Sequence, residues 1–264
     1  MVFWLYCTQR YRNTFYTGGT QMQIHVFKDS AQIGQAAATL IAAQLLRKPD
    51  SILGLATGSS PIPTYQALIG MHQAGVLDFS RAKSFNLDEY VGIDPNHVCS
   101  YHRFMQDNLF SQVNMKPENI HIPDGNAADI AASAAAYDAA IVAAGGIDLQ
   151  LLGIGRNGHI GFNEPGDAFI YGCHEVELSQ STIEANTRFF DSEADVPRAA
   201  VSLGIGAIMQ AKQVLLIATG ADKAEAIRQA VEGDVSPQCQ ASILRTHPDV
   251  VFLLDEAAAS LLNK

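Results

Sequence analysis

Short apolar runs alternate along this chain with longer stretches in which apolar residues recur every three or four positions. The short runs are typical of buried strands, and the longer spacing is typical of amphipathic helices. In the first helical stretch the apolar positions are Ile33, Ala37, Leu40, Ile41 and Leu45. The strand-like runs are "QIHVF", "SILGLA", "KSFNL", "NIHIP", "IDLQLLGI", "AAVSLG", "QVLLIA" and "DVVFLL". Strands separated by helices predict an α/β fold, with a doubly wound, mostly parallel sheet and helices on both faces.

The alternation begins at Met22 and continues without a linker, repeat or low-complexity segment, so we predict one Rossmann-like domain over 22–264. Ligands of such sheets bind outside the carboxyl ends of the strands. Residues 1–21 are different, because they are rich in aromatic residues and contain the only Trp. Their short apolar part lacks the basic flank and the A-x-A pattern of a signal peptide. We expect a disordered or loosely docked N-terminal extension there.

Composition limits the possible functions. The chain is 48% hydrophobic and 17% charged, which is typical of a compact globular protein. No apolar run approaches the length that spans a bilayer. The net charge of −10 argues against nucleic-acid binding, but a small anion can still bind beside a few local cations. The four cysteines lie far apart without a C-x-x-C motif, which predicts no zinc site and favours a reducing cytoplasm. We expect a cytoplasmic protein without a metal, membrane or nucleic-acid partner.

The stretch "LLGIGRNGHIGFNEPG" contains the G-x-G-x-x-G spacing at Gly153, Gly155 and Gly158. A dinucleotide site needs a helix directly after the third glycine. Pro165 and further glycines disfavour a helix there, so we reject a nicotinamide site. We expect instead a turn at the end of a strand.

That turn presents Asn157, His159, Asn163 and Glu164. A histidine near a carboxylate can act as a general acid–base pair, because the acid sets the imidazole tautomer and tunes its pKa. A structural loop whose His and Glu satisfy backbone groups explains the same residues. The local sequence leaves both interpretations open.

Two further turns have the geometry of a phosphate site. "GLATGSSP" reads as strand, turn and helix start, with Ser60 as N-cap and Pro61 as the first helical residue. "LLIATGADKAEAI" repeats this order with Lys223 in the first helical turn, where a cation opposes the helix dipole unless it binds an anion. "NTRFF" adds Arg188, whose guanidinium suits phosphate oxygens. The alternatives are a plain capped turn and ordinary surface cations. The groups that can cradle the phosphate in the first turn belong to Thr57, Gly58, Ser59 and Ser60.

"FNLDEYVG" ends a strand with Asp88 and Glu89 side by side. Adjacent residues in an extended chain point to opposite faces, so we expect only one of them to enter a site. A carboxylate at this position can remove a proton from a carbon beside a carbonyl. The alternative is an acid that caps a turn or helix, and the spacing does not say which acid matters.

Together these segments and "SYHRFM" resemble the glucosamine-6-phosphate deaminase (glucosamine/galactosamine-6-phosphate isomerase) family in order and spacing over 22–255. The resemblance implies conversion of glucosamine 6-phosphate and water to fructose 6-phosphate and ammonia, without an organic cofactor. It implies that Asp88 is the base for enolisation and that His159 opens the sugar ring, supported by Asn157 and Glu164. It further implies that the phosphate is held by Thr57, Gly58, Ser59, Ser60, Arg188 and Lys223.

The sequence departs from the best-known members in two ways. Some members carry Asp where this chain has Asn157, so we expect a ring-opening trio without a central negative charge. Hexameric members activated by N-acetylglucosamine 6-phosphate have basic residues after the "FNEP" motif. Here that segment contains Glu175 and Glu177 and no Lys or Arg. We therefore expect an unregulated monomer or small homo-oligomer.

Two alternatives remain, one a related enzyme and one a protein of another class. A 6-phosphogluconolactonase-like hydrolase resembles this chain in fold and phosphate turn, but it needs no base at the strand end, so "FNLDEY" favours the deaminase. A non-catalytic sugar-phosphate-sensing module predicts an attached DNA-binding region, and the 21 residues before the domain are too few for one.

Overall fold

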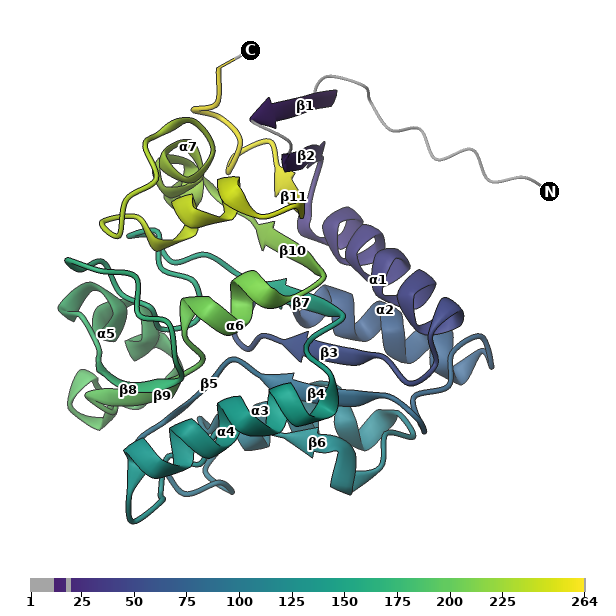
Figure 1. The fold of residues 1–264 in the computed structure, drawn as a ribbon, viewed down its shortest axis with the longest axis vertical. Helices are drawn as coiled ribbons and strands as arrows, with labels where there is room; N and C mark the ends of the chain where they lie inside the picture. The colour runs from purple at the N-terminus through teal and green to yellow at the C-terminus, as the bar shows by residue number, and fades with distance from the viewer. Residues whose placement is uncertain (1–11, 18–19, 264) are drawn as a thin grey trace.

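An eight-stranded sheet forms the centre of the computed structural model, which describes residues 12–17 and 20–263 (Figure 1). β1 pairs antiparallel with β2, and all other neighbours pair parallel, which confirms the predicted mostly parallel α/β sheet. In spatial order the strands are β1 (Arg12–Thr17), β2 (Thr20–Phe27), β11 (Asp249–Asp255), β10 (Gln213–Ala218), β7 (Leu149–Leu152), β3 (Ile52–Leu55), β4 (Lys83–Asn86) and β6 (Ile120–His121).

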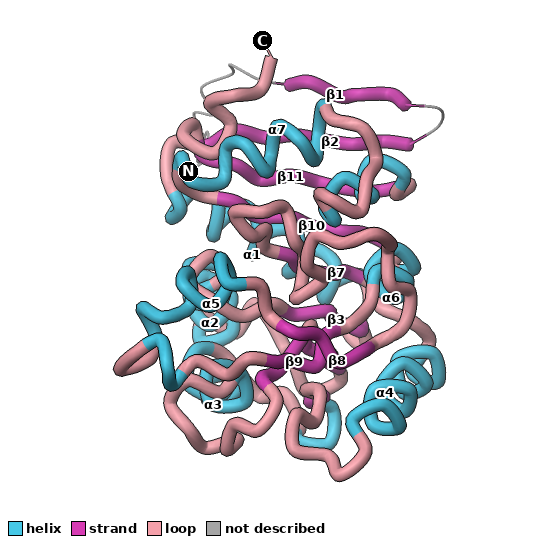
Figure 2. The backbone as a smooth tube through the Cα atoms, turned by 90° about the vertical axis from the view of Figure 1, so that its left-hand side faces the viewer, coloured by secondary structure: helices cyan, strands magenta, loops and turns pink. Residues whose placement is uncertain are grey.

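Helices cover both faces of this sheet (Figures 1 and 2). Asp29 caps the first helix, α1, by accepting the Gln32 amide at 2.9 Å. The predicted apolar positions of α1 are buried except Leu40, which is partly buried against the same core. On one face lie α1 (Ser30–Arg47), α2 (Ile62–Gln73) and α3 (Tyr101–Asn108); on the other lie α4 (Ile130–Ala144) and α6 (Ile205–Gln210).

A second, antiparallel sheet lies beside the carboxyl ends of the main strands and consists of β5 (Asp88–Tyr90), β9 (Ala199–Ser202) and β8 (His174–Glu177). The sequence pattern groups "AAVSLG" with the parallel strands, but the structure places it in this sheet as β9. Residues 200–202 are all buried, so the run does not alternate. Its pattern identifies a buried strand without identifying the sheet.

The direction of winding reverses between β3 and β7. From β3 the chain continues to β4 and β6 on one side, and from β7 it continues to β10 and β11 on the other. The loops after β3 and β7 therefore lead away from each other and leave a crevice at the carboxyl ends of the strands. In Figure 1 the arrowheads of β3, β4 and β7 point to this side of the sheet.

Two boundaries differ from the sequence pattern. α2 begins at Ile62 with Pro61 in the N-cap position and no side-chain cap, so the prediction that Ser60 is the N-cap is wrong. Pro61 already has helical angles, and its carbonyl accepts the Tyr65 amide at 3.0 Å. Within the expected N-terminal extension, residues 12–17 form β1, while 1–11 and 18–19 lie outside the described residues. Among the described helices, none is long and apolar enough to cross a membrane.

Candidate active site

A cavity of about 470 Å³ occupies the crevice at the carboxyl ends of the strands. Its walls come from the loops after β3, β4, β7 and β10, from α3, and from α5 (Gln180–Asn186) with the turn that follows it. Glu164 lies behind the cavity wall and contacts Asn157 and His159. The other predicted site residues line the cavity: Thr57, Gly58, Ser59, Ser60, Asp88, Asn157, His159, Arg188 and Lys223.

Asp88 is the first residue of β5 and follows the carboxyl end of β4 closely. Before it, the Leu87 amide donates to the Leu55 carbonyl at 3.0 Å, and the Leu87 carbonyl accepts the Leu203 amide at 2.7 Å. The backbone at this point therefore links the two sheets. The Asp88 side chain faces the cavity, although the residue is only 6% exposed. Burial, with a smaller effect of the Glu89 charge, raises the pKa of the Asp88 carboxyl to about 8. A carboxyl that titrates near neutral pH can both take and return a proton.

Glu89 does not line the cavity. Its carboxylate accepts the backbone amides of Tyr101 and His102, each at 2.9 Å, at the start of α3. This arrangement agrees with the expectation that only one of the two adjacent acids enters the site. The spacing left open which acid it is, the family resemblance implied Asp88, and the structure places Asp88 there.

His159, Asn157 and Glu164 form one connected group in the loop after β7. His159 Nδ1 lies 3.5 Å from Glu164 Oε2, which is an ion-pair distance when the imidazole is protonated. Asn157 Nδ2 donates to the same oxygen at 2.7 Å, and the His159 amide donates to Asn157 Oδ1 at 3.2 Å. The cavity therefore has an imidazole on its wall with a carboxylate directly behind it.

Glu164 also accepts hydrogen bonds from Thr182 Oγ1 at 2.5 Å and from Ser179 Oγ at 3.1 Å. Burial by itself raises the pKa of the Glu164 carboxyl. The nearby charge of His159 and the hydrogen bonds from Thr182 and Asn157 outweigh burial and lower this pKa to about 2. Glu164 is therefore a carboxylate at neutral pH. No sequence motif identified Ser179 and Thr182 as partners of Glu164, since "LSQST" signals only the helix start that Ser179 caps.

Asn163 belongs to the same turn but serves the fold. It is 3% exposed, and its Nδ2 donates to the carbonyls of Ile160 and Leu203 at 2.8 and 2.9 Å. The structural interpretation of this loop therefore holds for Asn163, which does not line the cavity.

The glycines of this loop accommodate the histidine. A Cβ on Gly155 would lie 2.4 Å from the His159 ring, so a residue without a side chain is required there. Gly158 has φ +85° and makes the turn that leads to His159. The next helix along the described chain is α5, which begins at Gln180. Among the described residues no helix follows Gly158 directly, as the sequence predicts.

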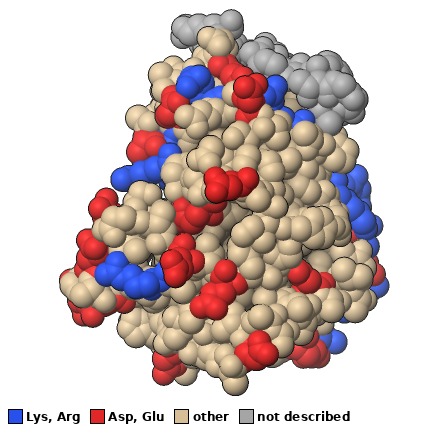
Figure 3. Space-filling model, turned by 60° about the vertical axis from the view of Figure 1, so that its left-hand side comes forward, with Lys and Arg blue, Asp and Glu red and all other residues tan. Residues whose placement is uncertain are grey.

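The predicted phosphate turns meet at one corner of the cavity. Arg188 Nη2 donates to Ser59 Oγ at 3.3 Å, which connects the turn after α5 to the turn after β3. Burial lowers the pKa of the Lys223 ammonium; Asp222 opposes this effect, and the nearby charges of Arg156 and Arg188 add to it. Three cations therefore lie close together in a chain of net charge −10. Acidic side chains, by contrast, are spread over the face of the molecule in Figure 3, where basic ones lie mostly toward the edges.

Arg156 is the member of this corner that the sequence analysis missed. It lines the cavity, and its Nε donates to Asp222 Oδ2 at 2.8 Å. The only signal for it was its position beside Asn157 in the quoted glycine stretch.

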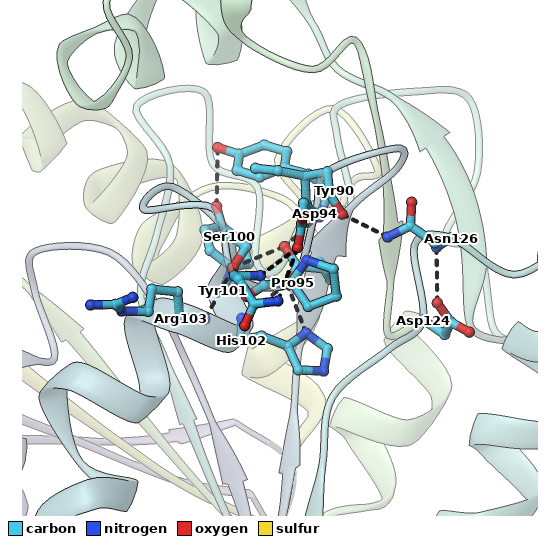
Figure 4. Close-up of polar contacts among 12 residues, drawn as sticks. Tyr90, Asp94, Pro95, Ser100, Tyr101, His102, Arg103, Asp124 and Asn126 are labelled. Atoms are coloured by element: carbon cyan, nitrogen blue, oxygen red, sulfur yellow. Dashed lines mark hydrogen bonds and ion pairs between the residues drawn. The ribbon is translucent and has the colours of Figure 1, made fainter.

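Aromatic side chains form another part of the wall. Tyr101 donates its hydroxyl to the Tyr90 hydroxyl at 3.3 Å, and Figure 4 shows the two hydroxyls facing each other. Phe162 packs near both rings, with centroids 5.7 and 6.1 Å away. Residue type alone did not mark these side chains, because aromatic residues also fill ordinary cores. Within the described chain, no cluster of three or more His, Cys, Asp or Glu residues could hold a metal ion.

The fold and this cavity define an α/β protein whose ligand site lies at the switch point of a parallel sheet. Residues 28–252 match the model of the glucosamine-6-phosphate isomerases/6-phosphogluconolactonase family, and the chain belongs to this family.

Named relatives agree with this assignment. The chain is 52% identical over 242 residues to a glucosamine-6-phosphate deaminase of Clostridioides difficile, covering 92% of this chain and 97% of the relative. It is 52% identical over 241 residues to that of Shewanella loihica, covering 91% and 90% of the two chains. A solved structure of a monomeric glucosamine-6-phosphate deaminase superposes with a TM-score of 0.88 at 43% identity, covering 90% of this chain and 99% of that one. A 6-phosphogluconolactonase from Trypanosoma cruzi has the same fold, with a TM-score of 0.72 at 20% identity, over 91% of this chain and 97% of that chain.

Proposed function

We propose that this chain converts glucosamine 6-phosphate and water to fructose 6-phosphate and ammonia. The observation that carries the proposal is that Asp88 and His159 face one cavity whose wall also holds Arg188 and Lys223, with Glu164 3.5 Å behind the His159 ring. A base, a proton carrier and an anion site are the three parts that this reaction needs. The deaminases that share about half of the sequence support the assignment.

The anion corner orients the substrate. The backbone and hydroxyls after β3, with Arg188 and Lys223, hold the phosphate far from the reacting carbons. Such remote binding positions the sugar for the chemical steps and can contribute several kcal/mol to lowering the barrier.

His159 opens the sugar ring. The closed sugar has no carbonyl group, so a proton must leave the anomeric hydroxyl and reach the ring oxygen. An imidazole on the cavity wall can accept the first proton and donate one to the ring oxygen. Glu164 stabilises the protonated imidazole, and Asn157 orients the carboxylate without adding charge.

Asp88 carries out the isomerisation. It removes the proton from C2 of the open amino sugar and returns a proton to C1, through an enolamine intermediate. The product is a C2 imine, which water hydrolyses to the ketose and ammonia. Burial keeps the carboxyl basic enough for proton removal from carbon.

The direct test measures ammonia and fructose 6-phosphate formed from glucosamine 6-phosphate by the purified protein. The same preparation is assayed for hydrolysis of 6-phosphogluconolactone, which needs no carbon base. Deaminase activity with little lactonase activity is the expected result, and the reverse would refute the proposal.

We further propose that the protein is cytoplasmic and acts as an unregulated monomer or small homo-oligomer. The similar monomeric deaminase supports the small assembly. Glu175 and Glu177 are exposed on β8, where a regulated enzyme would need basic residues to bind an anionic activator, and they support the absence of regulation. The described cysteines Cys99, Cys173 and Cys239 are free, as expected in a reducing compartment. Activation by N-acetylglucosamine 6-phosphate in steady-state assays would contradict the absence of regulation.

A further inference from the structure

The buried carboxylate of Glu89 accepts several hydrogen bonds although it lies outside the cavity. The residue is 2% exposed. Its Oε1 accepts the amides of Tyr90 and Tyr101, each at 2.9 Å. Its Oε2 accepts the His102 amide at 2.9 Å and lies 3.0 Å from His102 Nδ1. Both oxygens thus have donors, which compensates for burying the charge.

These bonds attach β5 to the first turn of α3. The first amides of a helix have no acceptor within the helix. Here Glu89 accepts the amides of Tyr101 and His102, and the Ser100 hydroxyl accepts that of Arg103 at 3.0 Å. Figure 4 shows Ser100, Tyr101 and Arg103 together at this end of the helix. The partial positive charge of the helix start also stabilises the Glu89 carboxylate.

Three residues of the cavity wall depend on this attachment. Asp88 and Tyr90 flank Glu89 on β5, and Tyr101 begins α3. The hydrogen bond between the hydroxyls of Tyr101 and Tyr90 joins α3 to β5 a second time, on the side that faces the cavity. A small rotation of β5 would move the Asp88 carboxylate, and a misplacement of about 1 Å can reduce a rate about 10²-fold.

Glu89 also acts on Asp88 through its negative charge. Burial raises the pKa of the tyrosines and the cysteine near Asp88, so these groups are uncharged near neutral pH. Among the titratable groups that interact with Asp88, Glu89 therefore supplies the negative charge. The titratable groups that interact electrostatically with Asp88 come from α2, β5, α3, α4 and the segment before β8: Tyr65, Glu89, Tyr90, Tyr101, Tyr137 and Cys173.

We propose that Glu89 is a positioning residue for the deamination, with His102 as its side-chain partner. It orients Asp88 toward the cavity by holding β5 against α3, and its adjacent negative charge strengthens Asp88 as a base. This inference rests on the function proposed above, in which Asp88 removes the C2 proton.

Glu89→Gln tests both parts, because it preserves the shape of the side chain and removes its charge. We expect kcat to fall about tenfold or more, with little change in KM because the anion corner is untouched. The acid limb of the pH profile of kcat/KM should move to lower pH by about 1 unit, since Asp88 loses its anionic neighbour. An acid limb that stays in place would overturn the proposal, because a purely structural Glu89 lowers activity equally at every pH.

Asp107→Asn is the matched control. Asp107 lies on the same helix in an exposed ion pair with Arg103 at 2.7 Å, and it does not line the cavity. This variant should retain the wild-type rate and pH profile.

Substitutions of His102 decide the question if Glu89→Gln does not fold. Asn retains a donor near the position of Nδ1, whereas Phe removes it. We expect kcat to fall severalfold in His102→Phe and to recover in His102→Asn. Equal rates in the two variants would overturn the role of the pair.

A titration of the Asp88 carboxyl by carbon-13 NMR, in the unliganded wild type and Glu89→Gln, requires no turnover. A lower Asp88 pKa in the variant supports the proposal, and an unchanged one contradicts it. A wild type without deaminase activity would refute the proposed function instead, so the two failures are distinguishable.

Discussion

The imidazole of His159 and the carboxylate of Glu164 lie 3.5 Å apart, and the Asn157 amide donates to the same carboxylate oxygen. A carboxylate held in this way can stabilise a protonated imidazole throughout a proton transfer. The side chain of Asn157 is neutral, so Glu164 is the negative group of the trio.

His159→Gln should separate the two chemical steps. Without an imidazole the ring opens slowly, so we expect weak overall turnover of glucosamine 6-phosphate. Exchange of the C2 proton should persist in substrate analogues that are already open, because Asp88 is intact. Proton exchange is measured by NMR in deuterated buffer. An equal loss of both activities would contradict the separate roles of His159 and Asp88.

Glu164 should make the folded protein sensitive to acid. Its pKa falls from 4.5 to about 2 on folding, so the stability it contributes is present above pH 4.5 and is lost as the pH falls toward about 2. Wild type should therefore lose up to about 3 kcal/mol more than Glu164→Gln across this range. Urea unfolding at several pH values measures the difference. Glu175→Gln, an exposed acid on β8, is the control and should behave as wild type.

Asp88→Asn should reduce deamination at least ~10²-fold, because the amide cannot remove a proton from carbon. The same substitution should stabilise the fold at higher pH. The pKa of Asp88 rises from 3.8 to about 8 on folding, so its favourable contribution is present below pH 3.8 and is lost as the pH rises through about 8. We expect the variant to melt at least a few degrees above wild type near pH 8 and to match it near pH 4. A variant with nearly full activity would contradict the role of Asp88.

Gly155→Ala should abolish most activity, because its Cβ would lie 2.4 Å from the His159 ring and would displace the imidazole. Gly153, the first glycine of the same motif, provides the control. Nothing lies within 4 Å of a Cβ placed on Gly153, so Gly153→Ala should lower activity far less than Gly155→Ala. Steady-state rates and melting temperatures of the two variants give the comparison. Equal losses would mean that the glycines do not serve to seat His159.

Arg156→Gln should weaken substrate binding. It removes one of three cations beside the anion corner and breaks the 2.8 Å ion pair with Asp222. We expect KM to rise about 3- to 10-fold, corresponding to about 1 kcal/mol, with a small change in kcat. Inorganic phosphate should also become a weaker competitive inhibitor. Arg103→Gln, which breaks an exposed ion pair on α3, should leave KM unchanged.

The hydrophobic pattern alone predicts the main sheet and much of its helical cover, because period and residue type depend on local burial. The same information places Asp88, His159 and the turn from Thr57 to Ser60 at the ends of strands. It does not separate β9 from the parallel strands, since a run that is buried on both faces reads the same in either sheet.

The sequence by itself determined the strand ends, the glycine turn without a following helix, and the carboxylates and cations available for chemistry. Only the tertiary structure decided that Glu89 turns away from the cavity to the start of α3, that Gly155 makes room for an imidazole, and that Arg156 joins the anion corner. The physical reason is that residue type and hydrophobic periodicity depend on the local structure of each segment. Contacts such as Glu164 with Thr182 join segments that only the winding of the sheet brings together.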